Sequence, residues 1–129
     1  MKLSGYQSIV KKSAQETFDF LNIPNNFKTI LPQNLSFFEA DDQHFSFQLQ
    51  NVPTKIHLVK KSDNTFPTVV YTAQGSIAFE LQIQLQAIED QQTQANWIFE
   101  GSLNPMLQMM VETPLKKLLA EMSGNLEQL

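Results

Sequence analysis

The feature that most constrains the fold is a strict alternation of apolar and polar residues near the middle of the chain. From residue 77 to 87 every second side chain is apolar, and the residues between them are polar from Glu80 onward. The apolar set is Ile77, Phe79, Leu81, Ile83, Leu85 and Ala87, and the polar set is Glu80, Gln82, Gln84 and Gln86. Because successive side chains of a strand point to opposite faces, this period predicts a long β-strand with one buried and one wet side.

Shorter segments repeat the same alternation. They place apolar residues at every second position over 45–49, 55–58, 69–74 and 95–99, and a weaker version covers 2–11. Turn-forming residues separate them, for example at Asp41-Asp42 and over 89–92. Short connections between alternating strands predict an antiparallel meander.

The end of the chain changes to a helical period. Asn104 can cap a helix and Pro105 suits its first position. One apolar stripe then follows at steps of three and four residues: Leu107, Met110, Val111, Pro114, Leu115, Leu118, Leu119, Met122 and Leu126. Pro114 cannot donate to the carbonyl of Met110, so we expect a kink there. Glu112 and Lys116 form an i,i+4 ion pair on the helix surface.

Two short helices are expected between the first strand and the meander. Ser13 and Glu16 have the spacing of a capping box, which opens a helix that Pro24 ends. A second helical turn follows over 25–30. The sequence therefore predicts one α+β domain over residues 1–129, in which the dry face of an antiparallel sheet of about six to seven strands and the apolar stripe of a long C-terminal helix bury each other.

Composition excludes several functional classes. The net charge is −4, every basic residue is Lys, and there is no Cys. A chain without Arg or a basic patch is a poor nucleic-acid binder, and one without Cys has no thiolate nucleophile or thiolate metal site. With neither an apolar leader nor a membrane-length apolar run, we expect a cytoplasmic protein that is not an integral membrane protein.

Three local motifs occur in an order that resembles a known superfamily. They are Ser13-Ala14-Gln15-Glu16-Thr17-Phe18-Asp19-Phe20-Leu21, Asn26-Phe27-Lys28-Thr29-Ile30-Leu31-Pro32, and Leu103-Asn104-Pro105-Met106-Leu107-Gln108-Met109-Met110 followed by Pro114-Leu115. Together they resemble the first, second and last helices of START-like (SRPBCC) proteins, which include Bet v 1-like allergens and polyketide cyclases, and in particular small bacterial members. The resemblance covers essentially the whole chain. It departs from Bet v 1 proteins, because the chain has only four Gly and no Gly-rich loop.

The resemblance implies a helix-grip fold, in which a curved antiparallel sheet wraps around the C-terminal helix with a cavity between them. It also implies a theme of apolar ligands such as lipids, sterols or aromatic molecules. It does not imply an activity, since the superfamily mixes carriers, enzymes and co-chaperone-like domains.

The predicted ligand-binding surface is the dry side of the sheet and helix. It comprises Phe45, Phe47, Ile56, Leu58, Tyr71, Phe79, Leu81, Trp97 and Phe99 from the sheet, and Met106, Leu107, Met110, Val111 and Leu118 from the helix. The same pattern also describes a filled core. A pocket is favoured by the flexible Met residues around 106–110 and by the polar tips of Tyr71 and Trp97, which could orient a ligand.

Catalytic signals are sparse. The chain has two His, His44 and His57, and its paired carboxylates at Asp41-Asp42 and Glu89-Asp90 lie in predicted turns. We expect no catalytic residues, no metal site and no cofactor.

Three hypotheses remain open at this stage. The first is a non-catalytic carrier or sensor of a small apolar ligand. The second is a protein-interaction module or homodimer with a filled core. The third is an enzyme of the cyclase, dehydratase or hydrolase kind, which would need an inward ionisable group.

Overall fold

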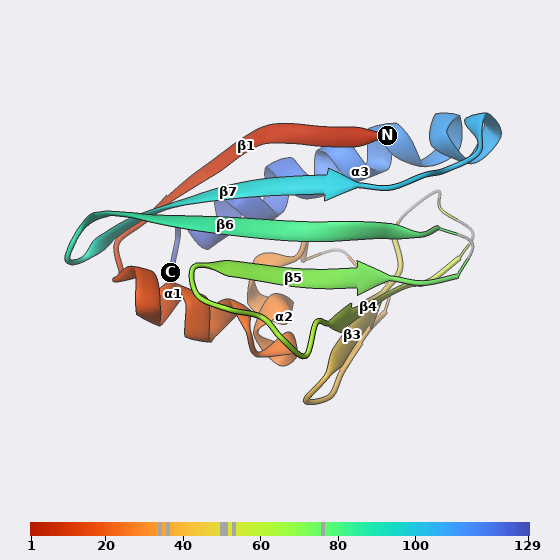
Figure 1. Cartoon of the computed structure of the whole chain (residues 1–129). Helices are drawn as coiled ribbons and strands as arrows, with labels where there is room; N and C mark the ends of the chain where they lie inside the picture. Colours follow the sequence, from red (N-terminus) through yellow and green to blue (C-terminus); the bar gives the residue numbers. More distant parts are fainter. Residues whose placement is uncertain (34, 36, 50–51, 53, 76) are drawn as a thin grey trace.

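The structure is a computed structural model, and it describes residues 1–129 except 34, 36, 50, 51, 53 and 76 (Figure 1). Within the described residues, seven strands and four helical segments follow one another along the chain. In order they are β1 (Lys2–Val10), α1 (Ala14–Leu21), η1 (Pro24–Asn26), α2 (Phe27–Ile30), β2 (Phe38–Ala40), β3 (His44–Phe47), β4 (Ile56–Lys60), β5 (Thr68–Ala73), β6 (Phe79–Glu89), β7 (Gln92–Glu100) and α3 (Pro105–Leu126).

All seven strands form one sheet in the order β1-β7-β6-β5-β4-β3-β2, and neighbouring strands are antiparallel. The meander from β2 to β7 agrees with the predicted short connections, and β1 joins it beside β7. The strand β2 was not predicted, because its three residues are too few to show an alternation.

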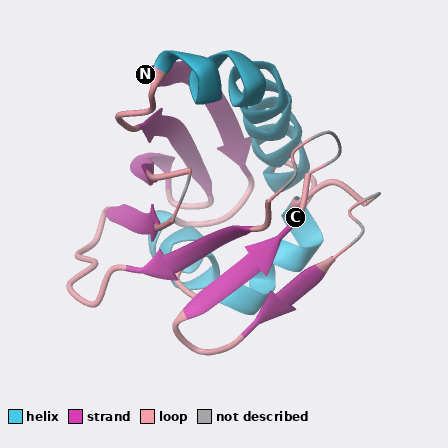
Figure 2. Cartoon of the chain, turned by 90° about the vertical axis from the view of Figure 1, so that its right-hand side faces the viewer, coloured by secondary structure: helices cyan, strands magenta, loops and turns pink. Residues whose placement is uncertain are grey.

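The sheet curves, and the helices lie on its inner side (Figure 2). The inward residues of β5, β6 and β7 alternate with outward ones, and they belong to one core cluster with Val111, Leu115, Leu118 and Leu119 of α3. The predicted helix-grip arrangement, with a curved antiparallel sheet around the last helix, is therefore confirmed.

The predicted helix starts are also present. Ser13 Oγ accepts from the Glu16 amide at 3.0 Å, and Glu16 Oε1 accepts from the Ser13 amide at 3.3 Å, which completes the capping box. At the last helix, Asn104 Oδ1 accepts from the Leu107 amide at 2.9 Å, and Pro105 occupies the first turn.

The weak alternation of the first strand has a structural cause. The pairing of β1 with β7 shifts between Leu3 and Tyr6, and Gly5 lies between them with φ near +89°. This irregularity changes which residues face inward: Leu3 is buried before it, and Ser8 and Val10 are buried after it. A glycine suits the site because other residues rarely adopt that backbone conformation.

No helix in the described part of the chain has an apolar stretch long enough to cross a membrane.

Candidate apolar ligand site

The sheet half of the predicted binding surface is buried as expected. Every predicted residue from the strands is at most 3% exposed, and all of them belong to the core cluster. They are Phe45, Phe47, Ile56, Leu58, Tyr71, Phe79, Leu81, Trp97 and Phe99. The period-two alternation therefore placed these side chains on the correct side of each strand.

The helix half of the surface divides into two parts. Val111 and Leu118 are buried, and Leu107 is half-buried. In contrast, Met106 is 74% exposed and Met110 is 46% exposed, so their predicted place on a dry surface is wrong. Met106 stands five residues before Val111, which puts it about 140° around the helix from that buried residue.

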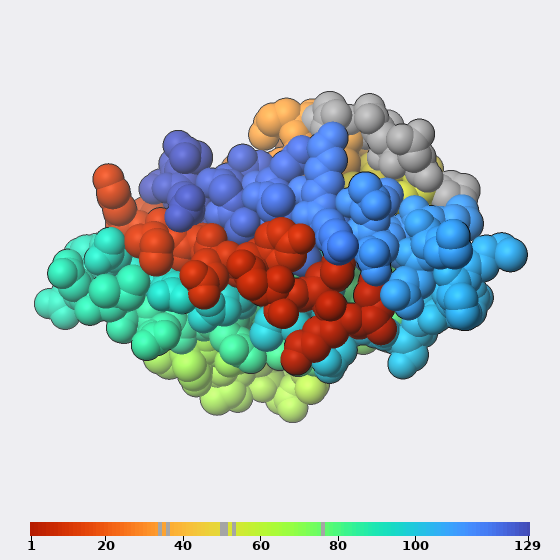
Figure 3. Space-filling model, turned by 90° about the horizontal axis from the view of Figure 1, so that it is seen from above, coloured from red at the N-terminus to blue at the C-terminus, as the bar shows by residue number. Residues whose placement is uncertain are grey.

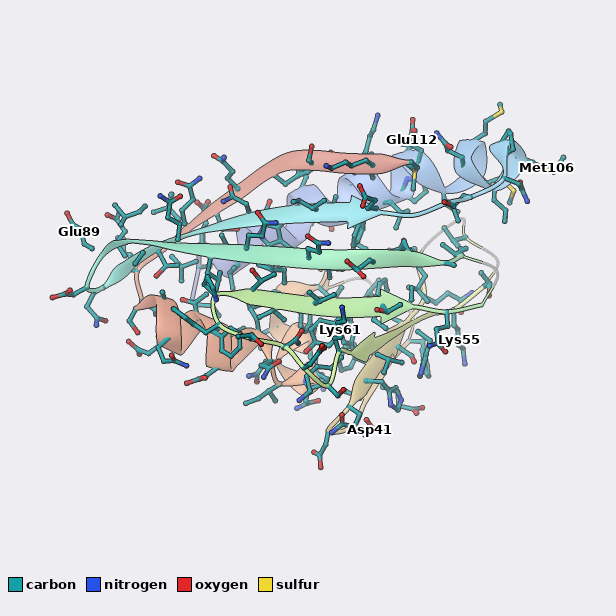
Figure 4. All side chains as sticks on the ribbon, in the orientation of Figure 1. Asp41, Lys55, Lys61, Glu89, Met106 and Glu112 are labelled. Atoms are coloured by element: carbon teal, nitrogen blue, oxygen red, sulfur yellow. The ribbon has the colours of Figure 1, made fainter. Side chains whose placement is uncertain are left out.

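The position of the helix adds a second reason for this exposure. The first turns of α3, where Met106 is labelled, project past the end of β7 (Figure 4). Seen from above, the rest of α3 lies alongside β1, and the first turns form the end of the molecule (Figure 3). The neighbouring Met109 is 84% exposed there.

The polar tips of Tyr71 and Trp97 have partners within the protein. Tyr71 Oη donates to the carbonyl of Leu21 at 2.7 Å, and burial raises the pKa of the Tyr71 phenol well above its usual value. Trp97 Nε1 donates to Ser8 Oγ at 2.9 Å, and Ser8 Oγ donates to the Ser123 carbonyl at 2.6 Å. Because these donors are satisfied internally, they hold the fold together rather than point at open space.

Ser8 and Ser123 were not singled out by the sequence analysis. The available signal was a polar residue at an inward position of β1, two residues before the buried Val10. The irregularity at Gly5 hid that position, because the inward-facing residues are odd-numbered before it and even-numbered after it.

Aromatic side chains fill the interior beside the short helices. The rings of Phe27 and Phe45 stack at 4.3 Å between centroids, and Tyr71 meets both of them edge-on at 5.1 and 5.3 Å. Stacked and edge-on aromatic pairs at such distances are the favourable arrangements of the ring quadrupoles. This side of the interior is a packed core.

The two halves of α3 are held differently. Its C-terminal half bonds to three other segments: Ser123 to Ser8, Asn125 Nδ2 to the Ile30 carbonyl at 2.9 Å, and Glu127 just beyond the helix to the Ile9 amide at 2.7 Å. In the N-terminal half, the side-chain bonds recorded for Gln108 and Glu112 stay within the helix. Pro114 lies between the halves and cannot donate to Met110, and the helix changes direction along its length (Figure 2).

Two hollows of the described surface lie away from the predicted residues. One of about 410 Å³ lies between the segment 22–25 and the β2–β3 hairpin, and Lys60 also lines it. The other, of about 280 Å³, is lined by Pro105, Gln108, Met109 and Glu112 on the first turns of α3. The second hollow therefore lies beside the exposed Met109.

Ionisable side chains gather on the outer side of the β2–β3 hairpin instead of inside the sheet. His44 Nδ1 lies 2.8 Å from Asp41 Oδ1, and Ser46 Oγ lies 2.6 Å from His57 Nδ1. Asp41 also accepts from the amides of Gln43 and His44, and these bonds lower the pKa of its carboxyl. No group of three or more His, Asp or Glu suited to a metal ion occurs among the described residues.

Carboxylates of the last two strands and of the hairpin between them lie on the outer side of the sheet or at the surface. Glu89 and Asp90 are exposed at the β6–β7 hairpin (Figure 4), and Glu100 pairs loosely with Lys2 at 3.9 Å. Glu80 is half-buried and accepts from Gln82 Nε2 at 2.6 Å. None of these carboxylates faces the buried side of the sheet.

Comparison with known proteins shows similarity of structure only. No protein-family model matches the chain, and no curated protein sequence matches it significantly. A norcoclaurine synthase from Thalictrum flavum in complex with dopamine and hydroxybenzaldehyde matches with a TM-score of 0.72 and 16% identity, covering 99% of this chain and 84% of that one.

Two bacterial structures are also similar. A START superfamily protein from Mycobacterium smegmatis matches with a TM-score of 0.66 and 10% identity, over 98% of this chain and 97% of that one. An Aha1 dimer from Colwellia psychrerythraea matches with a TM-score of 0.61 and 15% identity, over 98% and 96% respectively. The similarity extends over nearly the whole chain.

Proposed function

Because this chain has the helix-grip fold of the START-like (SRPBCC) superfamily, we propose that it is a non-catalytic binding protein for a small apolar ligand. The ligand is held between the sheet and α3, at the end where the first turns of the helix leave the core. Its chemical class is lipid-like or aromatic.

One observation carries the proposal. The apolar stripe of α3 starts inside the core at Leu118 and Val111 and emerges, partly uncovered, at Leu107 and Met110. When a ligand covers apolar surface that is continuous with a core and open to solvent, the free energy falls by roughly 25 cal/mol per Å² of apolar surface buried. Met side chains adapt to ligands of different shape, which suits a site of this kind.

The chemistry of the interior supports binding rather than catalysis. Among the described residues, the buried polar side chains other than Tyr71 and Trp97 are Ser8, Thr17, Thr93 and Ser123, together with Ser46, which faces the outer side of the sheet. These groups do not titrate near neutral pH, and no described buried side-chain nitrogen or oxygen lacks a hydrogen-bond partner. A ligand in this interior is therefore recognised mainly by apolar contact and shape.

One of the similar structures supports this ligand class. The norcoclaurine synthase that shares the fold holds two aromatic molecules, dopamine and hydroxybenzaldehyde. That protein is an enzyme by its name, and the chemistry of a fold is decided by its site residues.

The first experiment is native mass spectrometry of gently purified protein, compared with its denatured mass. We expect an additional non-covalent mass that leaves on denaturation and can be identified after extraction. Met110→Lys places a charge on the stripe and should remove that mass, whereas Met109→Lys, about 100° around the helix from Met110 and 84% exposed, should keep it. Retention of the bound mass by both variants would rule out a site at the start of α3.

The second candidate is a protein-interaction module or homodimer. Met109, at 84% exposure, points away from the interior and suits a partner's surface better than an internal ligand. If this candidate is correct, native mass spectrometry gives the mass of a ligand-free dimer. Met109→Lys should then give the mass of the monomer without altering the packing of the core.

A further inference from the structure

Two histidine rings meet on the outer side of the sheet, away from the proposed ligand site. The ring centroids of His44 and His57 lie 4.4 Å apart with a tilt of 41° between the rings. The register of β3 and β4 pairs His44 with Val59 and Ser46 with His57, so the two His are diagonal neighbours on adjacent strands. Both side chains are partly open to solvent.

Each ring is held through the same nitrogen. His44 Nδ1 lies 2.8 Å from Asp41 Oδ1, and His57 Nδ1 lies 2.6 Å from Ser46 Oγ. Asp41 is itself fixed by the amides of Gln43 at 2.8 Å and His44 at 2.9 Å. On both rings, Nε2 is therefore the nitrogen left for a ligand.

We propose that His44 and His57 together bind one divalent transition-metal ion through their Nε2 atoms. Imidazole nitrogen suits Zn²⁺, Cu²⁺ and Ni²⁺ rather than Mg²⁺ or Ca²⁺. Metal–nitrogen bonds of about 2.0–2.1 Å bring two ligating nitrogens to roughly 3 Å from each other, so the rings must be close neighbours. With ring centroids 4.4 Å apart, the two rings are such neighbours.

The partners of Nδ1 are those that metal-ligating histidines use. Such histidines generally donate their other N–H to a carboxylate or another oxygen, which fixes the ring and raises its basicity. Asp41 supplies the carboxylate for His44. Ser46 Oγ lies within hydrogen-bond distance of His57 Nδ1 and would accept from it in the tautomer that binds a metal through Nε2. With two protein ligands, the remaining coordination positions belong to water or to a small anion.

The sequence makes the test unusually clean, because the chain has two His and no Cys. Untagged protein is titrated with Ni²⁺, Cu²⁺ and Zn²⁺ by isothermal calorimetry. A shared site takes up one ion per chain, most tightly for Cu²⁺. His44→Gln or His57→Gln alone should weaken binding at least tenfold, and the double variant should remove it.

A matched pair of variants examines the carboxylate. Asp41→Asn keeps an acceptor for the backbone amides but loses the charge beside His44, and should weaken binding about tenfold. Asp42→Asn, in the same exposed turn, should bind as the unaltered protein does. Equal affinity in these two variants would contradict the role given to Asp41.

A second measurement needs no substitution. In nuclear magnetic resonance spectra, substoichiometric Cu²⁺ should broaden the signals of both imidazoles together. Two ions per chain, separate broadening of the rings, or no binding at all would each overturn the shared site. Loss of the apolar ligand mass in the earlier experiment would leave this result unaffected, since the two sites lie on opposite sides of the sheet.

Discussion

Ser8 joins the first strand to the last helix and to the only tryptophan of the chain. Its buried hydroxyl accepts from Trp97 Nε1 at 2.9 Å and donates to the Ser123 carbonyl at 2.6 Å. Ser8→Ala removes both bonds, each with a net value of about 0.5–1.5 kcal/mol, and leaves the indole N–H buried without a partner at about 1–3 kcal/mol. We expect the free energy of unfolding to fall by about 2–4 kcal/mol, taking the overlap of these contributions into account.

Urea unfolding followed by circular dichroism and by Trp97 fluorescence measures this change. Ser4→Ala, an exposed position on the same strand, is the matched control and should fall within about 0.5 kcal/mol of the unaltered protein. In a double-mutant cycle, Trp97→Phe removes the donor that Ser8→Ala would leave without a partner. The loss in the double variant should therefore be smaller than the sum of the two single losses by about 1 kcal/mol or more. Because Trp97→Phe removes the only tryptophan, the cycle is followed by circular dichroism alone. Additive losses, or a Ser8→Ala effect no larger than that of Ser4→Ala, would refute the proposed network.

Three further predictions concern other elements. Burial raises the pKa of Tyr71 in the folded protein, so above the ordinary phenol pKa of about 10 the unfolded chain ionises first and the free energy of unfolding falls as pH rises. Tyr71→Phe should flatten that decline in urea titrations at alkaline pH, and it should lower the free energy of unfolding at pH 7 by about 1 kcal/mol. Pro114→Ala restores an amide donor to the helix interior, so it should stabilise the protein by about 1–3 kcal/mol and slow hydrogen exchange over 105–113; unchanged exchange there would contradict the idea that Pro114 loosens the first turns. Glu112 lies 3.6 Å from Lys116 on an exposed helix surface, so Glu112→Gln should lower the free energy of unfolding by no more than about 0.5 kcal/mol. A larger loss, measured by calorimetry, would assign Glu112 another role.

Periodicity predicted the fold well where the segments were long. The alternation from Ile77 to Ala87 gave β6, although the strand itself begins at Phe79, and the stripe from Leu107 to Leu126 gave α3. The caps at Ser13 and Asn104 were predictable because their bonds are local. The strand β2 was not predicted, because it is short and its pairing with β3 is set by the hairpin at Asp41.

The site was predicted less completely, because its contacts join distant segments. Helical period placed Val111 and Leu118 inside, but it carries no information about where the sheet ends and therefore about the exposure of Met106 and Met110. The partners of Tyr71 and Trp97 lie 50 and 89 residues away in sequence, at Leu21 and Ser8. The meeting of His44 and His57 depends on the register of β3 and β4, which a single strand pattern does not give.

The bond from Glu127 to the Ile9 amide has a consequence for how the chain behaves at high concentration. An open sheet has two outer strands whose unpaired backbone groups can recruit strands of other molecules. On β1, Glu127 occupies one such amide and the irregularity at Gly5 interrupts the straight edge, while β2 at the other side offers only three residues. These features together protect both borders of the sheet against strand-to-strand aggregation.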